Sequence, residues 1–278
     1  MTSFDSSAVG LWSDDDPFEV TRERIASYAA ATNDPIPAHL AGDVAPPVFA
    51  IVPAFMSLVQ SAFLVAPPEV ALRVVHGEQD FVFHRPIRPG DRLLTRGQPL
   101  GYAGAPNGTS AAFLFESRTE SGELVNEQYT TAFFRGVDVG STVGTPAPPH
   151  KFDESLRASA PVAKVVAHVD DDQTYRYAPA SGDPMPIHLD ADAARAAGLP
   201  GIIAHGLCTM AFTSWAVLTE LASSDVSRLR RLAVRFARPV LPGQDIATTI
   251  WPAGARRFAF ETTAGDQVVI KDGLAEID

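Results

Sequence analysis

The feature that most constrains the fold of this chain is an internal repeat. Residues 28–39 read Y-A-A-A-T-N-D-P-I-P-A-H, and residues 177–188 read Y-A-P-A-S-G-D-P-M-P-I-H. Tyrosine, aspartate, two prolines and histidine fall in register without a gap, and a second shared frame, R-P-x-x-P-G, occupies 85–90 and 238–243. The sequence therefore predicts two halves built on one plan.

Each half carries the same order of predicted elements. The apolar segments at 49–65 and 206–222 are apolar on most faces, which predicts two long buried helices. Runs with alternating apolar residues, rich in β-branched and aromatic types, follow each helix and predict strands. These runs are 71–84, 91–97, 108–119 and 123–134 in the first half, and 229–238, 245–252, 256–263 and 267–277 in the second. Each half is thus predicted to be α+β, a long helix wrapped by an antiparallel sheet, and the two halves to pair as a pseudo-dimer.

A connector is predicted between the halves. Residues 138–151 hold three prolines and two glycines and show no periodicity. We therefore expect an N-terminal domain at 1–150 and a C-terminal domain at 151–278. The length of 278 residues suits two domains of ordinary size.

Composition excludes several classes of partner. The formal net charge of −11 argues against nucleic acid, which normally needs a basic face. The single cysteine, Cys208, permits no disulfide within the chain and suits a reducing cytoplasm. The first residues lack the basic and apolar regions of a signal peptide. No apolar run is expected to reach the roughly 20 residues that span a bilayer, so no membrane partner is expected.

The second copy of the motif places an acid and a base five positions apart. Pro184 and Pro186 disfavour a continuous helix, so Asp183 and His188 are expected on a stiff loop. An imidazole has an unperturbed pKa of about 6.5, and burial can shift a carboxyl toward neutrality. Such a pair can activate water or move a proton next to a carbonyl.

A short helix is expected after this loop. Asp190 or Asp192 would cap it, and Gly198 would end it. The local run of His188, Asp190 and Asp192 also suggests a metal site, but no further histidine stands at ligand spacing, so no metal is predicted.

The pair His205-Gly206 opens the second long helix. Backbone N–H groups there lack partners inside the helix, and the helix dipole favours negative charge. Gly206 is therefore a candidate oxyanion-binding residue. His205 is expected to pack or cap the helix start, and Cys208 to be buried and inert.

These residues resemble a known family. The stretch Y-x-x-x-S-G-D-P-x-P-I-H-x-D, followed by I-I-A-H-G-L-C-T-M, is similar to the MaoC-like hydratases and dehydratases, which include the R-specific enoyl-CoA hydratases and have the hot-dog fold. The similarity covers most of 160–278. The first half, with V-A-P-P-V-F-A at 44–50, resembles the noncatalytic N-terminal domain of double hot-dog members.

The resemblance implies a hydro-lyase of acyl-CoA metabolism that needs no cofactor. It would add water to a trans-2-enoyl-CoA to give a (3R)-3-hydroxyacyl-CoA, or catalyse the reverse. Asp183 and His188 would hold and activate the water, and the N–H of Gly206 would bind the thioester oxygen. Met185 departs from the family, which has asparagine there, and this predicts a changed acyl pocket or a slower site, with different chemistry as the alternative.

Several alternatives stay open from the sequence. The chain could be a hot-dog thioesterase that uses Asp183, or a noncatalytic acyl-CoA-binding subunit. Asp34 and His39 are a structural remnant or a second active site. Arg231 and Arg235 form a solvated face or contact the phosphates of coenzyme A. A long, branched or ring-bearing acyl chain and a cytoplasmic homodimer are expected.

Overall fold

The computed structural model describes residues 4–278, apart from the side chains at positions 71 and 72. The chain forms two compact units. The first contains the residues up to Glu19, Pro53–His84 and Arg92–Pro149, and the second contains Val20–Val52, Arg85–Asp91 and His150–Asp278. One boundary therefore lies at the predicted connector. Two early segments pack with the C-terminal part of the chain, so both copies of the repeated motif lie in the second unit.

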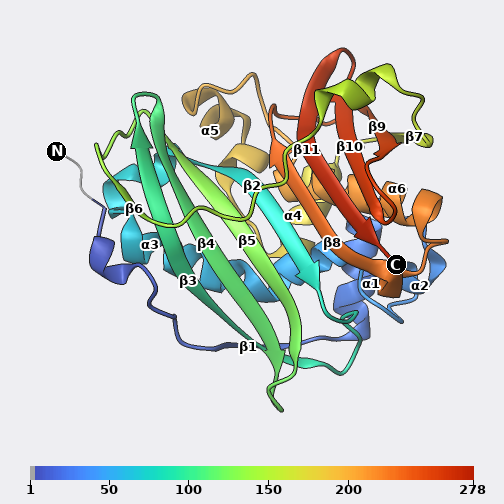
Figure 1. Ribbon diagram of the computed structural model, residues 1–278, viewed down its shortest axis with the longest axis horizontal. Coiled ribbons are helices and arrows are strands. Elements are labelled where there is room, and N and C mark those ends of the chain that lie inside the picture. Colours follow the sequence, from blue (N-terminus) through green and yellow to red (C-terminus); the bar gives the residue numbers. More distant parts are fainter. Residues whose placement is uncertain (1–3) are drawn as a thin grey trace. The chain divides into compact units, whose positions relative to one another are not determined.

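The first unit is built on an antiparallel sheet in the order β1-β3-β4-β5-β2, with β6 paired to β3 (Figure 1). All four strands predicted in this half are present, whereas β1 and β6 were not predicted. The elements are η1 (Ser6–Ala8), β1 (Asp16–Glu19), α3 (Phe55–Val65), η3 (Pro68–Arg73), β2 (Val74–Phe83), β3 (Arg92–Ala105), β4 (Gly108–Thr119), β5 (Leu124–Arg135) and β6 (Thr142–Gly144).

The prediction of a long buried helix at 49–65 is wrong in two respects. Pro53 lies in a 3-10 segment, η2 (Pro47–Ala54), and the α-helix α3 begins only at Phe55. Proline lacks the N–H that a continuous α-helix needs at that position. The helix also buries only a narrow stripe of Ser57, Ser61 and Val65. Three large apolar side chains of α3 stay exposed instead: Met56, Phe63 and Leu64.

The same segment corrects the expectation about apolar length. Taken together, Pro47–Val65 is a helical stretch of 19 residues with a mean hydropathy of 2.1, long and apolar enough to cross a membrane by length and composition alone. Half of its most apolar window is buried in the structure. A core helix in a soluble protein passes the same test, so this stretch is by itself weak evidence for a membrane span.

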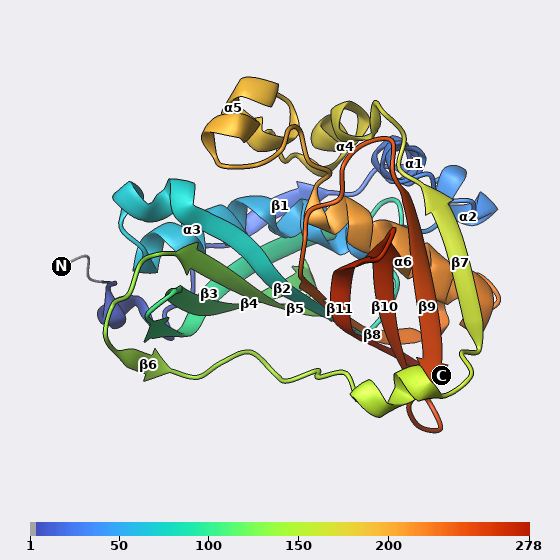
Figure 2. The same cartoon turned by 90° about the horizontal axis from the view of Figure 1, so that it is seen from above.

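The second unit has its own antiparallel sheet in the order β8-β11-β10-β9-β7 (Figure 2). The four predicted strands are confirmed, and β7 is additional. The elements are α1 (Arg22–Ala31), α2 (Pro37–Leu40), η4 (Glu154–Ala158), β7 (Ala163–His168), α4 (Gln173–Ser181), η5 (Pro186–His188), α5 (Ala191–Ala196), α6 (Gly206–Leu221), η6 (Val226–Arg228), β8 (Leu229–Phe236), β9 (Asp245–Pro252), β10 (Arg257–Ala264) and β11 (Gln267–Ile277).

The helix α6 is the core of this unit, as predicted. Every residue from Leu207 to Leu218 is buried, and α6 contacts β7, β8, β9 and β11. The hydroxyl of Thr213 lies 3.0 Å from that of Thr262 on β10, so the polar groups on the helix also find partners in the sheet. Cys208 lies within this buried stretch, where burial raises the pKa of its thiol well above the usual range.

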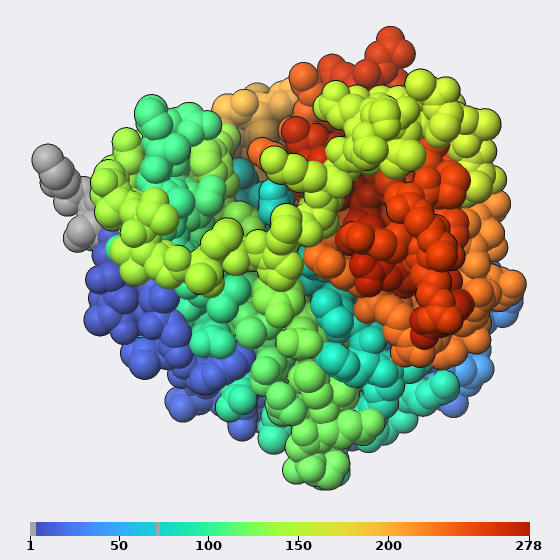
Figure 3. All heavy atoms as spheres, in the orientation of Figure 1, coloured from blue at the N-terminus to red at the C-terminus, as the bar shows by residue number. Residues whose placement is uncertain are grey.

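The connector runs along the surface. Most residues of 138–149 are exposed, and these atoms are visible on the face drawn in Figure 3. The segment that follows the connector contains η4 (Glu154–Ala158) and bonds to the sheet of the second unit. The guanidinium of Arg157 donates from Nε and Nη2 to the two carboxylate oxygens of Glu261 on β10, at 2.9 and 2.8 Å. A paired bidentate geometry of this kind fixes orientation as well as distance.

The close approach of α3 to β3 gives a stability prediction. A Cβ added at Gly97 would lie 2.5 Å from Cε1 of Phe115 and 2.6 Å from Oγ of Ser61, which are both buried. We expect Gly97→Ala to lower the free energy of unfolding by about 1–3 kcal/mol through overpacking. Urea unfolding measures this change.

The matched control for Gly97→Ala is Gly201→Ala, because a Cβ at Gly201 meets nothing within 4 Å and its φ lies outside the left-handed region. Its free energy of unfolding should stay within about 0.5 kcal/mol of the wild type. Equal stability of the two variants would contradict the packing described for α3.

Candidate active site

The loop that carries the predicted acid and base follows helix α4. This helix ends at Ser181, and its C-cap residue Gly182 has a φ of 80°, in the left-handed region that glycine adopts readily. The carboxylate of Asp183 then accepts a hydrogen bond from the N–H of Met185 at 3.1 Å. The prolines that follow lead into η5, which ends at His188. The predicted helix after this loop is also present as α5, capped by Asp190.

The hydrogen bond of His188 defines its tautomer. Its Nδ1 lies 2.8 Å from the carbonyl oxygen of Ile203, and a carbonyl can only accept a hydrogen bond. Nδ1 therefore carries the proton, which leaves a lone pair on Nε2. Burial also lowers the pKa of His188 below its ordinary value, against the opposing effects of the Ile203 carbonyl and Asp183. His188 is thus suited to accept a proton at Nε2.

The environment of Asp183 shifts its pKa in the opposite direction. Burial raises the pKa of this carboxyl, while the N–H of Met185 and the neighbouring His188 partly offset the rise. A carboxyl with a raised pKa holds a proton more readily than a solvated one. Asp183 and His188 therefore form a pair in which the environment favours the neutral form of both groups. Pairs of this kind are typical of acid–base sites.

A third group, His205, joins this pair. Its ring stacks on that of His188, with centroids 3.8 Å apart and an angle of 25° between planes. Its Nε2 lies 3.3 Å from the backbone carbonyl of Asp183, and burial lowers the pKa of His205 to about 3. The expected packing role is confirmed. His205 occupies the N-cap position of α6, but its side chain makes no capping hydrogen bond there.

Asp183, His188 and His205 could be taken for a metal site. Each offers one ligand atom, and these atoms lie within 4.8 Å of one another. The lone pair of an imidazole nitrogen lies in the plane of its ring, however. Two rings stacked at 25° cannot both direct such lone pairs at one ion in a tetrahedral site. The arrangement suits proton transfer better than metal binding.

The start of α6 provides a candidate site for negative charge. Gly206 is the first residue of the helix, where the N–H groups have no partner in the helix. A Cβ added at Gly206 would lie 3.2 Å from Cδ1 of Phe236, so a larger residue here would press against the ring of Phe236. The role of Gly206 in binding an oxyanion stays a prediction.

The first copy of the motif has a different geometry. Asp34 and His39 bond directly, Oδ2 to Nδ1, at 2.7 Å, and their side chains are 1% and 0% exposed. Among the described residues, Nε2 of His39 has no hydrogen-bond partner. The hydroxyls of Tyr28 and Tyr177, which also belong to the repeat, meet at 3.2 Å. The burial of this pair and its direct bond favour the structural role over a second active site.

The other predicted binding residues lie in exposed or half-buried places. Met185 is 39% exposed beside Asp183, so its thioether is available to a ligand. Arg231 on β8 lies opposite Glu276, with Nη1 and Oε1 4.0 Å apart, and Arg235 is exposed opposite Lys271. Contact of these two arginines with coenzyme A stays a prediction.

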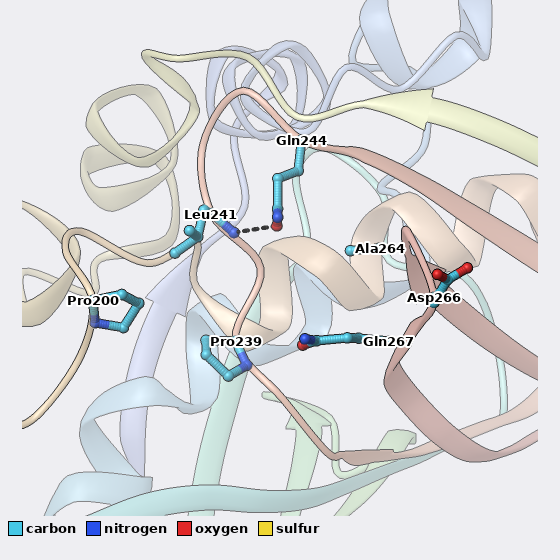
Figure 4. Close-up of a pocket in the computed structure, with 7 residues that line it drawn as sticks. All are labelled: Pro200, Pro239, Leu241, Gln244, Ala264, Asp266 and Gln267. Atoms are coloured by element: carbon cyan, nitrogen blue, oxygen red, sulfur yellow. Dashed lines mark hydrogen bonds between the residues drawn. The ribbon is translucent and has the colours of Figure 1, made fainter.

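A separate hollow in the second unit has a volume of about 440 Å³. Figure 4 shows it between the R-P-x-x-P-G loop and the turn joining β10 to β11, with the side chain of Gln244 accepting a hydrogen bond from the N–H of Leu241. Its lining contains one carboxyl group, that of Asp266, and no histidine. This hollow therefore lacks an acid–base pair, and the candidate active site is the cluster around Asp183.

Comparison with known proteins assigns the class. The MaoC like domain matches residues 153–272, and the FAS1-like dehydratase domain region matches residues 7–128. The chain is 32% identical over 215 residues to 3-hydroxyacyl-thioester dehydratase Y of Mycobacterium tuberculosis, covering 73% of this chain and 72% of that protein. The chain belongs to the MaoC-like dehydratase family.

Further similarities agree with this assignment. Peroxisomal multifunctional enzyme type 2 of Mus musculus is 46% identical over 99 residues, which are 35% of this chain and only 13% of that much longer protein. A MaoC-like dehydratase from Phytophthora capsici has a TM-score of 0.84 at 20% identity, covering all of this chain and 96% of that one. The predicted hot-dog fold is confirmed by such structures.

The sealed geometry of Asp34 and His39 gives a second prediction. Asp34→Ala leaves the N–H of Ile36 and Nδ1 of His39 without their acceptor in a buried place. We expect the free energy of unfolding to fall by about 1–3 kcal/mol. Thermal and urea unfolding measure this change, and turnover by the folded fraction should be retained.

The control for Asp34→Ala is Asp43→Ala, which removes an exposed carboxylate paired with Arg22 in the same segment. Its effect on stability should stay below about 1 kcal/mol. If Asp34→Ala kept full stability but lost turnover, the pair would be a second active site.

Proposed function

We propose that this chain adds water reversibly to a trans-2-enoyl-CoA and forms a (3R)-3-hydroxyacyl-CoA. The observation that carries the proposal is the proximity of the half-buried Asp183 to His188, whose Nδ1 is bonded to the carbonyl of Ile203 so that Nε2 is left as an acceptor. Burial raises the pKa of Asp183 and lowers that of His188. The names of the relatives support the same reaction class, because they include a 3-hydroxyacyl-thioester dehydratase and enoyl-CoA hydratases. No cofactor takes part in this scheme.

In the hydration direction, water donates one O–H to Nε2 of His188. The water oxygen attacks C3 of the enoyl thioester while Nε2 accepts the proton. The electron pair of the C2–C3 double bond moves toward the thioester carbonyl, and negative charge develops on its oxygen. The N–H of Gly206, at the positive end of α6, stabilises that charge.

Asp183 completes the reaction by donating its proton to C2. This step leaves a carboxylate at Asp183 and an imidazolium at His188, two opposite charges that stabilise each other. Return of the proton from His188 to Asp183 restores the starting state. Dehydration follows the same steps in reverse, so one site serves both directions.

We propose further that the acyl chain is long, branched or ring-bearing. One feature supports this choice. Met185 places an apolar, flexible side chain next to the reacting carboxyl. A cytoplasmic homodimer that binds acyl-CoA belongs to the same proposal.

The first test of the reaction is Asp183→Asn. The carboxamide keeps an oxygen to accept the N–H of Met185 but cannot donate an acidic proton. We expect kcat to fall by about 100-fold or more. Loss of enoyl-thioester absorbance measures turnover, and a thiol assay on the same samples measures release of CoA.

Asp192→Asn is the matched control, because Asp192 is exposed and pairs with Arg195 in α5. Its kcat should stay within about twofold of the wild type. Release of CoA without formation of a hydroxyacyl product would instead establish a thioesterase. Binding of enoyl-CoA with no turnover by the wild type would establish a noncatalytic subunit.

The acyl-chain proposal predicts a substrate ranking. Values of kcat/KM for trans-2-decenoyl-CoA, or for a branched or ring-bearing enoyl-CoA, should exceed that for crotonyl-CoA, because a larger acyl group gains more apolar contact. Initial rates over a range of concentrations of each substrate provide the comparison. Highest kcat/KM with crotonyl-CoA would show that the site selects short chains.

A further inference from the structure

His205 has no part in the proton transfers described above, yet it contacts both groups that carry them. We propose that His205 is a positioning residue, which holds the ring of His188 by stacking and the loop of Asp183 by a hydrogen bond. This inference rests on the proposed function for its kinetic consequences. Its structural consequences can be measured without turnover.

The stacking contact fixes one face of His188. The two rings are 3.8 Å apart with nearly parallel planes. The ring of His205 also contacts the ring of Tyr177, and the centroids of these two rings are 4.9 Å apart. Tyr177 is itself fully buried and bonded to the hydroxyl of Tyr28. The ring of His205 is therefore held against buried groups and can hold His188 in turn.

The hydrogen bond links the same ring to the main chain of Asp183. Nε2 of His205 lies 3.3 Å from the backbone carbonyl of Asp183, which can only accept. Nε2 therefore carries the proton of neutral His205. One imidazole thus contacts the ring of the base and the main chain of the acid. A displacement of His205 would alter the orientation of both groups toward the water they share.

Packing alone does not explain a histidine at this position. The side chain is 1% exposed, and among the described residues its Nδ1 has no hydrogen-bond partner. A buried polar atom without a partner is unfavourable for stability, and a phenyl ring would fill a similar volume without that atom. The imidazole adds what a phenyl ring lacks, a donor directed at Asp183.

The surroundings of His188 identify the groups that set its charge. Asp183 and His205 are the titratable groups in contact with it. Tyr175 of α4 donates to the carbonyl of Leu189, and Asp190 accepts hydrogen bonds at the start of α5, so neither needs His188 as a partner. Removing the ring of His205 would admit water to one face of His188. Its pKa should then rise toward the ordinary value of about 6.5.

The test compares His205→Ala, which removes the ring, with His205→Phe, which keeps a ring and removes the hydrogen bond. NMR titration gives the pKa of His188 in the protein without substrate. We expect His205→Ala to raise this pKa and His205→Phe to leave it near the wild-type value. With enoyl-CoA, His205→Ala should lower kcat by about 100-fold with KM nearly unchanged, and His205→Phe should recover part of that loss.

Cys208→Ala is the packing control, because Cys208 is buried in α6, the helix that begins after His205, and has no role in the proposed reaction. It should leave the pKa of His188 and kcat near the wild-type values. A normal kcat and an unchanged pKa of His188 in folded His205→Ala would overturn the proposal. Should His205→Ala not fold, a pKa in His205→Phe that rises to about 6.5 would overturn the stacking role. Absence of turnover in the wild type would refute the proposed function, while the titration would still decide the role of His205.

Discussion

The hydrogen bond from Nδ1 of His188 to the carbonyl of Ile203 is the interaction on which the site depends. It fixes the tautomer and so decides that Nε2 is an acceptor. The segment that supplies this carbonyl is itself held in place, because the N–H of Ala204 donates to the carbonyl of Val240 at 2.8 Å. Val240 belongs to the second R-P-x-x-P-G frame. One repeated motif therefore supports the backbone that orients the histidine of the other.

The two copies of the Asp–His motif have the same residue types but different hydrogen-bond partners for the histidine. In the first copy the carboxylate of Asp34 bonds directly to the ring of His39, and both are sealed in the core. In both copies the aspartate accepts a hydrogen bond from the N–H two residues later, that of Ile36 or of Met185, but in the second copy the histidine bonds to the backbone carbonyl of Ile203. Among the described residues, the candidate acid and base of the second copy are therefore not hydrogen-bonded to each other. The residue types are the same, and only their partners differ.

Much of the secondary structure could be predicted because the local signals were strong. The strands β2 to β5 and β8 to β11 follow alternation and turn residues, and α6 follows a long apolar run. The strand β7 was missed because only alternate residues are half-buried and the run is short. The helix α1 was missed because it lacks a clear apolar face, although Thr21 caps it. The apolar run at 49–65 was also present, but Pro53 in η2 and the buried serines of α3 gave this run a different structure from α6.

The sequence by itself determined the repeat, the proline-containing loop and the candidates for the acid and the base, because prolines, glycines and spacing act through local backbone geometry. It could not decide in which copy the acid and the base bond directly to each other, nor that His205 stacks on His188 across seventeen positions of the chain. Those outcomes depend on which backbone carbonyls and rings the packed core brings together. Burial then shifts the pKa values of Asp183 and His188, and burial is a property of the tertiary structure alone.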